Sequence, residues 1–257
     1  MSERTPSSPA VAAESAAPVP AALLREIDRD LRPVRPLPPP WRRAVTFVPV
    51  ALSALALVTA SWRWRFNAPS LGPLWAWGVS IAQAAVGFAI FGVALREAVP
   101  GRNLSRRALA VTLGGGAAVV IAVTLATSQT LPTAMPPGVW LRYAWECWGM
   151  SMLSAVPIFA VAAWLVARVR PTRPALAGAL CGLGVGVLAD SALRLFCWVS
   201  TPAHVFLSHG GAIITVVLAG TLVSVGVDRW IGGAAHRAPN NRSAREAGSP
   251  GRTTRTD

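Results

Sequence analysis

Long runs of apolar residues recur six times and dominate the pattern of this chain. A transmembrane helix needs about 20 consecutive apolar residues to cross a hydrocarbon core about 30 Å thick. Only the fifth run contains charged residues, Asp190 and Arg194. We therefore predict an all-α membrane protein with six transmembrane helices, since a soluble domain that buries six such helices on every side would be unusual. The runs occupy residues 44–61, 73–95, 108–127, 148–167, 175–196 and 207–227.

Charge gives the predicted helices an orientation. The net charge is +13, and all 24 basic residues are arginines that form no continuous basic block, so direct binding to nucleic acid is not expected. Basic residues collect in cytoplasmic loops of membrane proteins. When the loops are assigned to alternate sides, 20 arginines share the side of both termini, which predicts cytoplasmic termini. Four arginines fall on the other side: Arg63, Arg65, Arg142 and Arg194.

The segment before the first run, residues 21–43, has two parts. Residues 21–31 place four apolar side chains on one face of a short helix, Leu23, Leu24, Ile27 and Leu31. A helix this short is marginal alone in water, so the stripe needs a partner: the membrane, the protein's own loops or a cytosolic protein. Five prolines then favour an extended spacer up to residue 43. Beyond these parts, the composition of residues 1–20 and 232–257 predicts disordered tails, with the transmembrane domain at 44–231.

Candidate chemistry lies on the side opposite the termini. Cys147 directly precedes the fourth run and Cys197 follows the fifth, so topology predicts both thiols at one membrane surface, together with His204 and His209. Two such thiols can form a reversible disulfide or bind a soft metal ion. Two cysteines and two histidines suit Zn²⁺, but their spacing matches no standard zinc module, and interfacial residues without a special role are the alternative. Cys181, in mid-run, is expected to be a small buried hydrophobe.

The fifth run carries a row of small residues that ends in charges. Gly178, Gly182 and Gly186 repeat every four residues, and such rows let helices pack closely, within one chain or in a homodimer. Asp190 and Arg194 continue the row, and unpaired charges are costly inside a bilayer. We therefore expect them to form an intramembrane ion pair, which either has a purely structural role or is part of a switch linked to Cys197.

Four segments together resemble one protein family, the NrsF family of six-span inner-membrane anti-sigma factors, over residues 23–232. Members restrain extracytoplasmic-function sigma factors. Trp198 and Ser208 depart from the residues usual in the family, which are Pro after the second cysteine and Trp before the second histidine. The segments are Asp30–Arg43, Glu146–Cys147, Arg173–Leu180 and Leu193–Gly210.

The resemblance implies a multi-pass protein of the inner (plasma) membrane that is not an enzyme and requires no resident cofactor. Cys147 and Cys197 match the family cysteines needed for the response, and His204 and His209 match its paired histidines. A thiophilic metal ion or an oxidant would act as inducer at the thiols. The sigma factor would bind the N-terminal segment, through Leu23, Leu24, Ile27, Leu31, Pro33 and Val34.

Two other classes of function are weighed against this hypothesis. A membrane thiol-disulfide oxidoreductase would also use outer cysteines, but such enzymes normally carry closely spaced pairs, and each loop here offers one. A small transporter would need charges that converge at the midplane and two repeated halves. The sequence offers only Asp190 and Arg194, and no internal repeat is evident.

Overall fold

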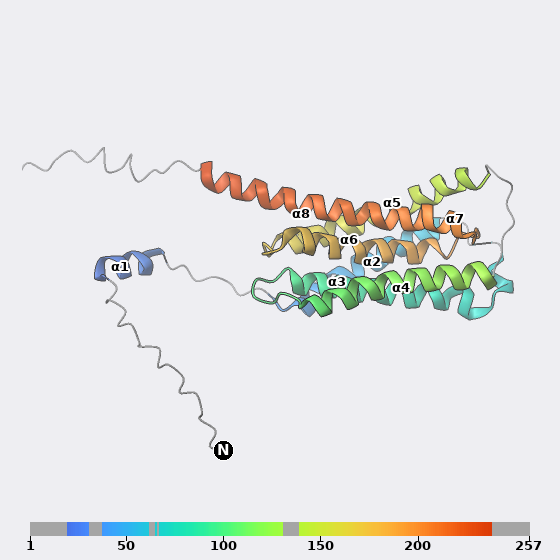
Figure 1. Cartoon of the computed structure of the whole chain (residues 1–257), viewed down its shortest axis with the longest axis horizontal. Coiled ribbons are helices and arrows are strands. Elements are labelled where there is room, and N and C mark those ends of the chain that lie inside the picture. Colours follow the sequence, from blue (N-terminus) through green and yellow to red (C-terminus); the bar gives the residue numbers. More distant parts are fainter. Residues whose placement is uncertain (1–19, 31–37, 62–64, 66, 131–138, 238–257) are drawn as a thin grey trace, which may run out of the picture. The chain divides into compact units, whose positions relative to one another are not determined.

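The computed structural model describes residues 20–30, 38–61, 65, 67–130 and 139–237, which form helices and short connections. The chain divides into two compact units, Met1–Leu37 and Pro38–Asp257. In the first unit, the described structure is the helix α1 (Ala21–Asp30), which lies in the predicted range. The second unit contains the long helices, which lie alongside one another in Figure 1.

Six helices of the second unit are long and apolar enough to cross a membrane, which confirms the predicted number of spans. The second span begins with the π-helical segment η2 (Leu74–Gly78), which leads into α3 (Val79–Glu97), and the short η1 (Ala68–Ser70) lies in the connection before it. The last span begins with the short α7 (Pro202–His204), followed by the π-helical segment η3 (Val205–Gly210), which leads into α8 (Gly211–Arg237). The long helices are α2 (Pro40–Ser61), α3 (Val79–Glu97), α4 (Arg106–Thr130), α5 (Val139–Ala167), α6 (Pro174–Leu193) and α8 (Gly211–Arg237).

Helix α6 forms the centre of the bundle. It has its main contacts with α8, α3 and α5, and Figure 1 shows it between α8 and α3. Of its most apolar stretch, 83% is buried, against 11% in α4 and 17% in α2. The outer helices therefore expose apolar side chains such as Val111 and Leu57, as expected where lipid and not water is the solvent.

Glycines set the close approach of α6 and α8. A Cβ atom on Gly178 would overlap the carbonyl oxygen of Gly220, and one on Gly182 would overlap the backbone at Val216. Gly186 lies against Ile213 in the same interface. The glycine row is therefore filled by a helix of its own chain, and a homodimer through it, which the sequence left open, would require α8 to leave.

At the end of α6 remote from Cys197, a buried carboxylate joins two loops. Glu97 closes α3 and is fully buried, and Arg173, just before α6, forms an ion pair with it across 2.7 Å. The backbone N–H of Leu104 donates to the same carboxylate at 2.7 Å. In a separate contact, Arg43 of α2 donates to the carbonyl oxygen of Leu165 in α5. These contacts fix the ends of α2, α3, α5 and α6 on the side that charge predicts to be cytoplasmic.

Several predicted boundaries differ from the structure: α2 begins at Pro40, within the predicted spacer, and α5 begins at Val139, ahead of the run predicted from residue 148. The fifth run was expected to extend to residue 196, but α6 ends at Leu193, because three- and four-residue turns replace the regular helix there. The tail was expected to begin at residue 232, yet α8 continues to Arg237. Helical backbone bonding does not stop where the apolar run stops, since it needs no lipid contact. The predicted tails at 1–19 and 238–257 lie outside the described residues.

Candidate functional site

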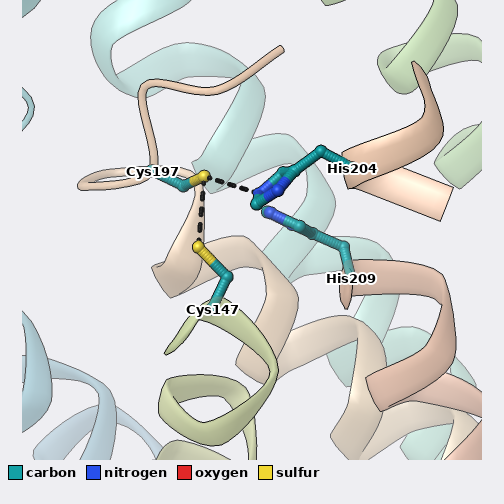
Figure 2. Close-up of side chains that lie close together, drawn as sticks. All are labelled: Cys147, Cys197, His204 and His209. Carbon is teal, nitrogen blue, oxygen red and sulfur yellow. Dashed lines mark hydrogen bonds between the residues drawn. The ribbon is translucent and has the colours of Figure 1, made fainter. Parts of the chain in front are cut away.

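Four side chains from three separate stretches of the chain meet at one end of the bundle. Cys147 belongs to the first turns of α5, and Cys197 follows the end of α6. His204 closes α7 and His209 lies in η3, at the start of the last span. Figure 2 shows the four side chains pointing toward one another. The structure thus brings together the four residues that the sequence placed on one membrane surface.

The distances within this cluster are those of direct contact. The Sγ atoms of Cys147 and Cys197 lie 3.5 Å apart, and Nε2 of His204 lies 3.4 Å from Sγ of Cys197. The rings of His204 and His209 pack edge to face with centroids 5.6 Å apart. One nitrogen or sulfur atom from each of the four residues lies within 4.8 Å of the others. Both thiols are free in the structure.

Hydrogen bonding favours a thiolate at Cys197. The Cys147 thiol donates to Cys197, which lowers the pKa of Cys197 below its ordinary value, and the contact with His204 lowers this pKa further. Burial opposes the shift without reversing it. Because a thiolate is the nucleophile and the metal ligand, this lowered pKa favours Cys197 over Cys147 as the reacting sulfur.

The backbone that follows α6 positions the Cys197 thiol in the cluster. After Leu193 the chain leaves the α-helix in a tightened turn, in which the N–H of Cys197 donates to the carbonyl oxygen of Leu193 at 2.9 Å. The turn swings Cys197 toward α5, while its thiol also reaches the carbonyl oxygen of Val199 at 3.8 Å. The last span then starts with Pro202, a residue whose fixed φ suits the first turn of a helix.

A buried polar network supports the cluster from behind. The Asp190 carboxylate accepts from Nδ1 of His209 at 2.6 Å and from Nε of Arg194 at 3.1 Å. Gln83 of α3 donates to the same carboxylate at 2.5 Å, and Arg194 reaches Thr124 of α4 at 3.4 Å. Asp190 and Arg194 thus form the ion pair that their spacing favours, and it is joined to His209.

Sequence reasoning missed Gln83 and Thr124 as members of this network. Gln83 carries the only amide in its predicted span, residues 73–95, and that isolated polar side chain was the available signal. Nothing comparable marks Thr124, because threonine is common in apolar helices, where its hydroxyl can bond the preceding turn as it does here. Cys181, by contrast, lies in the apolar core, as expected for a small buried hydrophobe.

The second group of predicted site residues is the N-terminal stripe. Leu23, Leu24 and Ile27 lie on α1 with 49%, 49% and 45% of their surfaces exposed. They share one face of the helix, with charged residues on the other. The remaining predicted positions, Leu31, Pro33 and Val34, lie outside the described residues.

Comparison with protein families decides what kind of protein this is. The sequence model of the NrsF family, described as "Negative regulator of sigma F", matches residues 28–230. The chain belongs to the NrsF family. The match spans all six long helices of the second unit up to residue 230 and includes Cys147, Cys197, His204 and His209. Comparison with curated proteins and with solved structures found no match.

Membership in the NrsF family gives the protein a class of function, the negative regulation of a sigma factor. This favours the regulatory hypothesis over the thiol oxidoreductase and the transporter. The apolar helices, long enough to span a bilayer, indicate that this NrsF protein is a multi-pass membrane protein.

Proposed function

We propose that this NrsF protein is an inner-membrane anti-sigma factor that holds an extracytoplasmic-function sigma factor through its N-terminal segment. The thiols of Cys147 and Cys197, on the periplasmic side, sense oxidants or thiophilic metal ions and release the sigma factor. The single observation that carries the proposal is the 3.5 Å contact between these two thiols in a protein of a sigma-regulator family.

The exposed stripe on α1 supports the binding half of the proposal. Leu23, Leu24 and Ile27 present an apolar helix face that is typical of segments docking into a groove of a partner protein. The arginine distribution predicts that this segment lies in the cytoplasm, where sigma factors are found. The other end of the bundle, with its two thiols, then faces the periplasm.

The thiol pair supports the sensing half. A two-electron oxidant can convert the pair to a disulfide, with loss of two protons and two electrons from the thiols and gain of the electrons by the oxidant. A soft metal ion would instead be held between the two sulfur atoms. Either event links α5 to the chain that follows α6, and so changes the constraint between these two helices.

Contacts at the far ends of the same helices offer a route for the signal. Arg43, at the start of α2, is buried and donates to the carbonyl oxygen of Leu165 near the end of α5. Since α2 directly follows the N-terminal segment in sequence, a shift of α5 against α6 would change the contacts at the start of α2, next to that segment. Couplings of this kind typically amount to about 1–3 kcal/mol, or about 5- to 150-fold in affinity, which is enough for a transcriptional switch.

Co-purification tests the binding half. The full chain is purified in detergent under reducing conditions and its bound proteins are identified. We expect one sigma factor to be enriched, and the triple change of Leu23, Leu24 and Ile27 to serine to remove it. Arg29→Ser is the matched control, because Arg29 lies opposite the apolar stripe on the helix and its replacement should leave binding unchanged. Failure of the intact protein to enrich any sigma factor would exclude the proposal.

A further inference from the structure

The thiol cluster has the geometry of a complete four-ligand metal site. In a tetrahedral zinc site, bond lengths of about 2.3 Å to sulfur and about 2.0–2.1 Å to nitrogen separate two sulfur ligands by about 3.8 Å and a sulfur from a nitrogen by about 3.6 Å. The sulfur atoms of Cys147 and Cys197 are 3.5 Å apart, and the sulfur of Cys197 is 3.4 Å from Nε2 of His204. Both separations differ from the tetrahedral values by only a few tenths of an ångström.

His209 adds a fourth ligand whose orientation is fixed from behind. Its Nδ1 is bonded to Asp190 at 2.6 Å, which leaves Nε2 as the nitrogen that faces the cluster. This Nε2 is buried and has no hydrogen-bond partner among the described residues. A carboxylate bonded to the far nitrogen of a histidine is the arrangement that orients histidines bound to metals. A buried nitrogen without a partner is costly, and a bound cation would compensate for it.

From this juxtaposition we propose that Cys147, Cys197, His204 and His209 bind one soft divalent cation of the Zn²⁺ class, with Asp190 as the positioning residue for His209. Thiolate and imidazole ligands select this class of ion over hard cations such as Mg²⁺ or Ca²⁺, which prefer oxygen. Two thiolates and two neutral imidazoles would neutralise the double charge, so the ion could reside in a buried site beside the Asp190–Arg194 pair.

Binding would also tie together parts of the bundle that are otherwise joined by packing. The ligands come from α5, from the chain after α6, and from α7 and η3 at the start of the last span. Through Asp190, the site connects further to Gln83 of α3. Metal binding would therefore fix one end of α3, α5, α6 and α8. The inference rests on the proposed function only where it makes this ion a signal for sigma release.

Metal binding is measured on the full chain in detergent, freed of metal by a chelator and dialysed against Zn²⁺ or Co²⁺. We expect one Zn²⁺ per chain, and with Co²⁺ the visible bands of a tetrahedral site together with a thiolate charge-transfer band. His204→Gln and His209→Gln should each weaken Zn²⁺ binding at least about tenfold. Asp190→Asn keeps all four ligands, so the Co²⁺ spectrum should persist while affinity falls roughly 10- to 100-fold.

Cys181→Ser is the matched control, since Cys181 is a buried cysteine of α6 that lies outside the cluster, and it should bind one Zn²⁺. Less than stoichiometric binding by the wild-type chain, or unchanged affinity in His209→Gln, would overturn the proposal. Should a histidine variant fail to fold, alkylation of the wild-type protein decides: Zn²⁺ must slow labelling of Cys147 and Cys197. Metal binding without sigma enrichment would refute the anti-sigma function alone, and the reverse result would refute the metal site alone.

Discussion

Asp190→Asn is the change that tests the buried network most severely. The substitution preserves the shape of the side chain but removes its charge, and it leaves Arg194, which is 8% exposed, without a counter-ion. It also replaces one of the two carboxylate oxygens that accept hydrogen bonds from His209 and Arg194 by an amide nitrogen, which can only donate. Hydrogen bonds between membrane helices contribute about 0.6 kcal/mol on average, whereas leaving a buried charge unpaired costs about 3–5 kcal/mol. The unpaired charge dominates, so we expect the free energy of unfolding to fall by about 3 kcal/mol.

A double-mutant cycle separates the charge from the hydrogen bonds. Arg194→Met alone should cost less than Asp190→Asn, because Asp190 keeps its bonds from His209 and Gln83. The double variant contains no unpaired charge at this pair, so it should be more stable than Asp190→Asn alone. The assay is reversible unfolding in detergent micelles, with the coupling energy obtained from the four proteins. A loss below about 1 kcal/mol for Asp190→Asn, or additive effects in the double variant, would refute the reasoning.

Two further predictions concern packing and the far end of the bundle. Gly182→Ala places a Cβ atom against the backbone of α8 and should destabilise the protein by about 1–3 kcal/mol. The control is Gly115→Ala, which has nothing within 4 Å of the added atom and should be neutral or stabilising. Equal thermal unfolding of the two variants would contradict the assigned α6–α8 interface. Glu97→Gln removes the buried charge that pairs with Arg173 and should lower the free energy of unfolding by about 1.5–3 kcal/mol. Glu146→Gln breaks the exposed ion pair with Arg142 and should lower it by less than about 1 kcal/mol. Chemical denaturation compares the two variants, and the opposite ranking would count against the burial argument.

The spans and the convergence of the thiols could be predicted because they follow from constraints that act along the chain. A bilayer demands about 20 apolar residues per helix, so the six runs identify the six helices almost directly. Alternation of loops between two surfaces then places Cys147 and Cys197 on the same side. Neither step requires knowledge of which helices are neighbours.

The network behind the thiols could not be predicted because it depends on helix neighbours and rotation. Gln83 and Asp190 are 107 positions apart in sequence, and their contact requires α3 and α6 to pack with particular faces together. The glycine row shows the same limit. A small-residue row predicts a close helix contact, but it carries no information about whether the partner helix is α8 or a second copy of the chain.

Sigma retention as a function of thiol state is the most direct test of the central claim. Membrane vesicles that contain the reduced full chain and its bound sigma factor are treated with a two-electron oxidant, and bound sigma factor is quantified. We predict that the wild-type protein and Cys181→Ser release the sigma factor, whereas Cys147→Ser retains it. Retention by wild-type protein in which mass spectrometry shows the Cys147–Cys197 disulfide would contradict the account.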